Sequence, residues 1–118
     1  MKLELIKVNN CGDQTKEYVS LEVVADANLE FYLLTDTTYT DDIHISNKLR
    51  HLYWFPKTAV KKGDFVWLDT GKGTNISRGN TAQTRTHIFY WNLAEPVWND
   101  DGDCAVLFEV SAWTTKRA

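Results

Sequence analysis

The chain has 118 residues, of which 25% are charged and 43% are hydrophobic, and its net charge is −3. This composition is typical of a folded globular domain and excludes a disordered chain. No apolar run approaches the ~18 residues of a membrane-spanning helix, and the first residues lack the apolar centre of a signal peptide. We therefore expect a single domain, residues 1–118, that is cytoplasmic and does not enter a membrane.

Apolar and polar residues alternate with a period of two, and no stretch has the spacing of an amphipathic helix. Between Leu5 and Ile6 the alternation changes phase, which indicates a β-bulge or a strand covered on both faces. Clusters of Gly, Asn and Asp separate the alternating segments, as turns require. The pattern predicts an all-β sandwich or barrel of seven or eight strands, of which we favour the sandwich, with strands at 3–8, 18–24, 29–34, 50–55, 64–69, 86–92 and 104–110 and a short extension at 111–115.

One face of each strand is expected to supply the core. The residues predicted to be buried are Val19, Leu21, Val23, Phe31, Leu33, Leu68, Val106 and Phe108. Two connections, at 36–49 and 71–85, are longer than turns need, and loops of this length are usually functional or disordered. The second contains three Gly and three basic residues but no acidic residue, so we expect it to be mobile and to meet an anionic partner.

Three segments resemble the lamin tail domain, a family of immunoglobulin-like β-sandwiches. They are Glu-Tyr-Val-Ser-Leu at 17–21, Lys-Gly-Asp-Phe-Val-Trp-Leu at 62–68 and Trp-Asn-Asp-Asp-Gly-Asp at 98–103. The turn and the Gly-Trp pair that often follow the first motif in the family are absent, as in a divergent bacterial-type member. The resemblance implies an immunoglobulin-like sandwich and a mostly non-catalytic module that binds proteins or DNA. It also implies a structural motif at the sandwich end, formed by Trp98, Asn99, Gly102 and Asp103.

Catalytic and metal sites have little support in the sequence. His44, His51 and His87 match no catalytic or metal-binding spacing, and Cys11 and Cys104 are expected to be free thiols. Clustered oxygens make Asp100, Asp101 and Asp103 weak candidates for a metal site, but the spacing of a calcium loop is missing and a turn explains them better. We expect no catalytic residue and no cofactor; a small metal-dependent hydrolase is the least supported alternative.

Binding residues are suggested by aromatic and basic side chains. The segments 53–55, 65–67 and 89–91 place aromatic residues on both faces of a strand, so some rings should point outward. Residues 44–90 contain eight basic residues and two acidic ones. We expect a non-enzymatic interaction domain with a protein partner, a second copy of the chain included. Nucleic-acid binding through 44–90 is the alternative. The candidate binding residues are Lys57, Lys61, Lys62, Lys72, Arg78, Arg85, Trp54 and Trp91.

Overall fold

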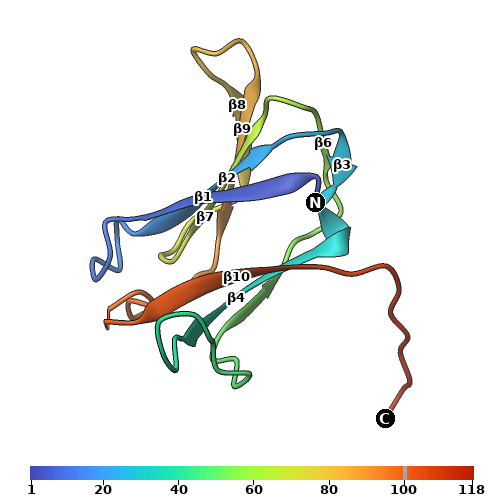
Figure 1. The fold of residues 1–118 in the computed structure, drawn as a ribbon. Coiled ribbons are helices and arrows are strands. Elements are labelled where there is room, and N and C mark those ends of the chain that lie inside the picture. Colours follow the sequence, from blue (N-terminus) through green and yellow to red (C-terminus); the bar gives the residue numbers. More distant parts are fainter. Residues whose placement is uncertain (100) are drawn as a thin grey trace.

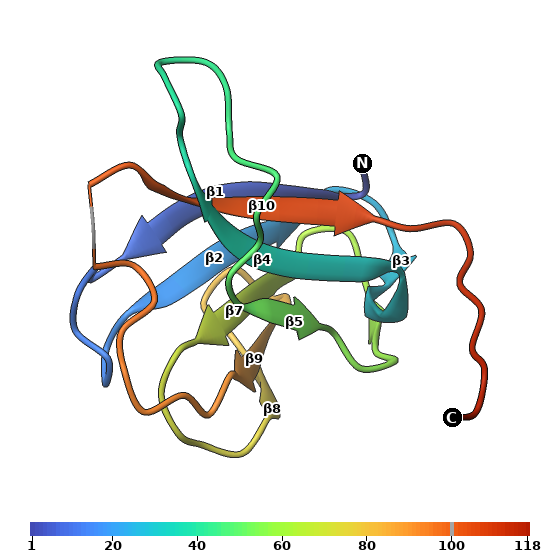
Figure 2. The same cartoon turned by 90° about the horizontal axis from the view of Figure 1, so that it is seen from below.

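The structure is a computed structural model, and it describes residues 1–99 and 101–118. These residues form two main β-sheets that face each other, so the predicted all-β sandwich is confirmed (Figures 1 and 2). The elements in chain order are β1 (Leu3–Asn9), β2 (Tyr18–Val23), β3 (Ala27–Asn28), the 3-10 turn η1 (Leu29–Phe31), β4 (Tyr32–Thr38), β5 (Leu52–Trp54), β6 (Ala59–Val60), β7 (Phe65–Asp69), β8 (Ile76–Gly79), β9 (Arg85–Tyr90) and β10 (Asp103–Glu109).

The first sheet has five strands in the order β1-β2-β7-β9-β8, and the second has three in the order β10-β4-β5. A small pair, β3 with β6, lies beside them. All described strand pairs are antiparallel except β7 with β9, which run parallel. The chain crosses between the sheets at η1, and Ala27 and Asn28 just before it pair with Val60 and Ala59 of β6. None of the described residues forms a helix long and apolar enough to cross a membrane.

The core lies between the two sheets and is made by alternate residues of their strands. Val19 and Leu21 of β2 and Leu68 of β7 are fully buried, as predicted, and Leu34 of β4 packs in the same cluster from the other sheet. The phase change in β1 is also confirmed, because the pairing with β2 shifts between Leu5 and Lys7 at a bulge.

The inner face of the second sheet is not the one that we predicted. Phe31 and Phe108 are exposed and Leu33 and Val106 are only half-buried, whereas Tyr32 and Leu34 are buried. Ala105 and Leu107 pack against the core in their place. In β4 the cause is η1, a turn that Asn28 caps by accepting a hydrogen bond from the backbone of Glu30. The turn shifts the alternation by one residue, and a shift of one residue exchanges the two faces of a strand.

Three predicted element boundaries are also wrong. The segment 71–85 is not a structureless loop, because it contains β8, which pairs with β9. Strand β4 extends to Thr38, so the first long connection begins later, and a single bridge joins Tyr39 to Ile45 within it. The extension at 111–115 is not a strand; the chain there is an extended tail that leaves β10 (Figure 1).

Candidate functional site

An aromatic groove lies on the outer face of the five-stranded sheet. It has a volume of about 450 Å³, and its lining is Ile6, Tyr18, Ser20, Phe65, Trp67, Asn80, Thr81, Ala82 and Thr86. Tyr18 of β2 and Trp67 of β7 form its aromatic floor, with ring centroids 4.8 Å apart. None of the lining residues is charged. The groove is therefore an apolar surface with a defined shape.

The strand pattern explains why these rings face outward. In β7 the buried residues are Val66 and Leu68, so Phe65 and Trp67 between them must point to the opposite face. In β2 the same alternation turns Tyr18 outward. Strand pairing then places Ser20 of β2 directly beside Trp67. The connection between β8 and β9 supplies the remaining wall of the groove.

The Asn80 and Ser20 side chains in the groove wall already have partners. The Asn80 amide donates to the hydroxyl groups of Thr84 and Thr86, and its oxygen accepts from the backbone of Ala82 and Thr84. The Ser20 hydroxyl donates to the carbonyl oxygen of Lys7 and accepts from Asn9. These polar side chains thus hold the wall in place, and the surface they leave for a ligand is mainly aromatic.

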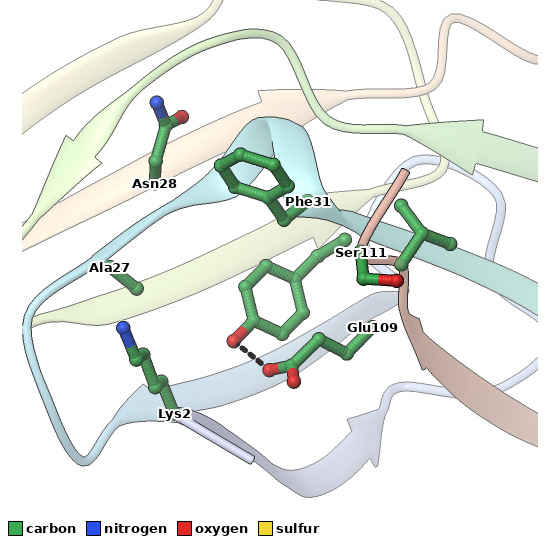
Figure 3. A pocket seen from close by; sticks show the side chains of 8 residues that line it. Lys2, Ala27, Asn28, Phe31, Glu109 and Ser111 are labelled. Carbon is green, nitrogen blue, oxygen red and sulfur yellow. Dashed lines mark hydrogen bonds between the residues drawn. The ribbon is translucent and has the colours of Figure 1, made fainter. Parts of the chain in front are cut away.

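A second hollow, of about 270 Å³, lies where η1 meets the end of β10. Phe31, Glu109 and Lys2 surround it (Figure 3). The Tyr32 hydroxyl donates a hydrogen bond to the Glu109 carboxylate. Burial, together with this carboxylate, raises the pKa of Tyr32 to about 12. This hydrogen bond occupies the phenol and one carboxylate oxygen of the hollow, and the hollow is smaller than the aromatic groove.

The structure does not bring the six predicted basic residues into one site. Lys61 and Arg85 lie near each other, since the backbone N–H groups of both donate to Asp64. The Lys61 ammonium pairs with Asp26 at 3.5 Å, and the Lys62 backbone donates to the same carboxylate. The remaining three are exposed elsewhere: Lys72 lines a hollow with Gln14 and Asp69, Arg78 lies on β8, and Lys57 lines a hollow beside β8.

The two predicted tryptophans lie apart from the groove. Trp54, on β5, is 48% exposed, and its indole contacts Trp113 of the C-terminal tail at 5.0 Å between ring centroids. Trp91 is half-buried and packs against Trp98 and Tyr53. The outward aromatic residue that we expected is thus present at Trp54, but it packs against the chain's own tail.

The four residues of the expected motif lie at the start of β10 or just before it. Trp98 is buried in the core cluster, and Gly102 has a φ of 87°, a conformation that favours glycine. Asn99 and Asp101 are exposed, while the Asp103 side chain is almost fully buried and lies 3.7 Å from the Arg50 guanidinium. Asp100, the remaining metal candidate, lies outside the described residues. Within residues 1–99 and 101–118, no group of three or more His, Cys, Asp or Glu side chains could hold a metal ion.

A polar cluster at the edge of the first sheet does not appear among the sequence candidates. His87 of β9 bonds Asp64 through Nε2 at 2.9 Å, and its Nδ1 bonds the hydroxyl of Ser77 on β8. Asp64 and His87 are both buried. Burial raises the pKa of Asp64, but the hydrogen bonds from His87 and from the backbone of Lys61 and Arg85 outweigh it and hold the pKa below its usual value.

Comparison with models of known protein families and with curated proteins finds no match for this chain. The aromatic pair Phe65 and Trp67 lies in one of the segments expected to present outward rings, and its alternation with Val66 and Leu68 indicates an outward position. The Ser77–His87–Asp64 cluster has no comparable signal, because only the strand register brings these three residues together.

Proposed function

We propose that this chain is an interaction domain that binds an apolar segment of a partner protein in the aromatic groove of the five-stranded sheet. The observation that supports this proposal is the set of three outward aromatic residues, Tyr18, Phe65 and Trp67, in one uncharged hollow of about 450 Å³. Large aromatic side chains that become fully desolvated provide most of the binding energy in protein interfaces.

The chemistry of the groove favours a protein ligand over a sugar or a nucleic acid. A sugar needs free hydrogen-bonding groups, but Asn80 and Ser20 in the wall already bond other protein groups. A single-stranded nucleic acid needs basic residues along its backbone as well as aromatic platforms. The groove lining contains no basic residue. A partner with an aromatic or aliphatic anchor matches the surface better.

Nucleic-acid binding through residues 44–90 stays the alternative proposal, with less support. Lys61, Lys62 and Arg85 begin the strands β7 and β9 or lie just before them, but Lys61 is paired with Asp26. Lys72 follows the opposite end of β7. DNA binding gains its affinity from several phosphate contacts, so the basic residues must lie together along one continuous surface.

Selection of random peptides displayed on phage provides the test, because it needs no knowledge of the natural partner. We expect the selected peptides to share an aromatic or aliphatic residue and to shift the NMR signals of Tyr18, Phe65 and Trp67. Trp67→Ala should weaken peptide binding by about tenfold or more, as expected for a central aromatic contact. Its melting temperature is measured alongside, since Trp67 is half-buried.

Trp54→Ala is the matched control, because Trp54 is an exposed tryptophan on the other sheet. It should leave peptide binding unchanged within about twofold. Peptides that bind the Trp67→Ala variant as tightly as the parent chain would rule out the groove as the site. A labelled single-stranded DNA that binds at low salt, loses affinity steeply as salt rises and no longer binds after Lys61, Lys62 and Arg85 are changed to Ala would favour the alternative.

A further inference from the structure

The cluster of Ser77, His87 and Asp64 joins a nucleophile, a base and a carboxylate in series. Ser77 lies directly opposite His87 in the β8–β9 pair, so both side chains are on the same face of the sheet. The His87 ring is buried and contacts Asp64 on its far side. Ser77 is exposed at the edge strand and closes the series toward solvent. A hydroxyl, an imidazole and a buried carboxylate in this order are the components of nucleophilic acyl transfer.

The tautomer of the neutral His87 ring follows from its hydrogen bond to the Asp64 carboxylate. Asp64 accepts hydrogen bonds from the backbone of Lys61 and Arg85 as well as from His87. These three donors stabilise the negative charge and keep the carboxyl group ionised. An ionised carboxylate can only accept, so Nε2 of His87 must carry a proton. In the neutral ring Nδ1 is then the acceptor, and the Ser77 hydroxyl donates to it. This tautomer places the basic nitrogen at the serine hydroxyl.

An opening beside Ser77 offers room for a small substrate. A hollow of about 260 Å³ lies between β8 and the segment after β5, with Pro56, Lys57, Thr58, Ile76, Ser77 and Phe89 in its lining. The apolar side chains suit a short acyl chain, and Lys57 provides a positive charge in the same hollow. Strand β8 is also an edge strand, so one side of its backbone has no neighbouring strand among the described residues.

We infer that Ser77 is a nucleophile that accepts the acyl group of a small ester, with His87 as its general base and Asp64 as the residue that positions His87. The Ser77 Oγ attacks the ester carbonyl carbon while its proton passes to His87 Nδ1. The C–O bond to the alcohol then breaks, and the alcohol leaves with that proton. Water attacks the acyl-serine with the same help from His87, which releases the carboxylic acid and restores the serine. This role differs from the sequence expectation of no catalytic residue, and it is separate from the groove on the opposite face.

Acetylation by p-nitrophenyl acetate tests the inference on the full chain. The background is the Cys11→Ser variant, because Cys11 is an exposed free thiol that would also react. Peptide mass spectrometry should find one acetyl group on Ser77, and release of p-nitrophenolate should begin with a burst of about one equivalent. Ser77→Ala should abolish this burst, and His87→Gln should slow it by about a hundredfold, the usual contribution of a general base. Ser111→Ala is the control, since Ser111 is an exposed serine outside the cluster; the burst should be unchanged.

The Cys11→Ser background alone can overturn the inference, so the outcome does not depend on the folding of any variant of the cluster. Acetyl groups found on lysines but not on Ser77 would exclude a nucleophilic serine. A Ser77 that reacts no faster than Ser111 would exclude its activation by His87. Either result would leave the peptide-binding proposal unaffected, because that proposal depends on Trp67.

The positioning role of Asp64 has a spectroscopic test. Long-range proton–nitrogen NMR spectra show which ring nitrogen of His87 carries the proton. We expect Nε2–H in the parent chain and Nδ1–H in Asp64→Asn, because the asparagine amide can turn its N–H group toward Nε2. The burst should fall together with this change of tautomer. An Asp64→Asn variant that keeps both the Nε2–H tautomer and the full burst would contradict the role.

Discussion

Glu17 is a buried carboxylate that links three parts of the chain. Its Oε2 accepts hydrogen bonds from the hydroxyl of Thr70 at 2.6 Å and from the backbone N–H groups of Val97 and Trp98. Its Oε1 accepts from the backbone of Gly12. The side chain is 1% exposed, so water cannot replace these partners. Glu17 therefore fixes the turn before β2, the end of β7 and the loop that carries Trp98 relative to one another.

Replacing Glu17 with Gln should destabilise the fold. The glutamine amide has nearly the same size, but its NH₂ group would face backbone donors and leave at least one of them unpaired. We expect the free energy of unfolding in urea to fall by roughly 3 kcal/mol, in line with the loss of buried hydrogen bonds to a charged group. Glu22→Gln, five residues further along the chain and on the outward face of β2, should change it by less than about 0.5 kcal/mol. Equal effects of the two variants would contradict this role of Glu17.

Asp69, at the end of β7, is a residue whose charge opposes folding. Its Oδ1 is buried and accepts no hydrogen bond from the described residues, and burial raises the pKa of this carboxyl above its usual value. Since the pKa is higher in the folded chain than in the unfolded chain, ionisation costs stability above the folded-state pKa. That cost disappears as the pH falls below the unfolded value. Asp69→Asn should therefore stabilise the chain at pH 7, by less than about 1 kcal/mol because the group is only half-buried, and not at low pH.

Asp26→Asn provides a control of opposite sign. The hydrogen bond from the backbone of Lys62 and the Lys61 ammonium lower the pKa of Asp26, so its ionised form favours the folded chain. The variant should lose stability at neutral pH, and this loss should disappear as the pH falls through the folded-state pKa. Melting curves across the acid range would measure both effects. A stability difference of the same sign in the two variants would show that burial does not govern Asp69.

At the scale of strands, the sequence predicts the first sheet better than the second. In β2 the buried residues Val19, Leu21 and Val23 alternate with polar or amphipathic ones, so only one face can be the core. In β10, by contrast, Cys104, Val106 and Phe108 on one face compete with Ala105 and Leu107 on the other. Two apolar faces carry no information on which one is inside. The turn η1 had the same effect on β4, because a three-residue 3-10 turn changes the phase without interrupting the apolar pattern.

The candidate sites, like the sheets, could be predicted only where the alternation within one strand decides which side chains point outward. The groove could be predicted in part, because Phe65 and Trp67 alternate with buried residues of one strand. Their pairing with Tyr18 of β2 could not, since it depends on the register between β2 and β7. Ser77, His87 and Asp64 come from three separate segments, and β8 itself was predicted as part of a loop. Glycine and serine near an edge strand lower its β-propensity, so pairing with β9, and not the local sequence, forms β8.

At the scale of the whole molecule, one core joins the two sheets. The buried cluster contains Leu68 and Val19 from the five-stranded sheet together with Leu34 and Phe55 from the other side of the sandwich. Neither sheet can keep these side chains from water without the other. The basic residues, by contrast, are distributed over several parts of the surface, so the charge imbalance of the sequence does not become a single patch. The molecule should therefore unfold as one unit, and its surface properties should depend on local sites.

Two core variants test this cooperativity. Leu34→Ala and Leu68→Ala each empty space at a fully buried position, one in each sheet, and each should cost about 2–5 kcal/mol of unfolding free energy. Because the sheets share one core, tryptophan fluorescence and far-ultraviolet circular dichroism should give the same unfolding midpoint in both variants. Ile43→Ala is the control, since Ile43 is 79% exposed in the connection after β4 and its loss should change the midpoint little. A Leu34→Ala variant in which one probe unfolds before the other would show that the three-stranded sheet can separate. The core would then be two weakly coupled layers, because the loss of one side chain in β4 would not destabilise the five-stranded sheet that holds Leu68.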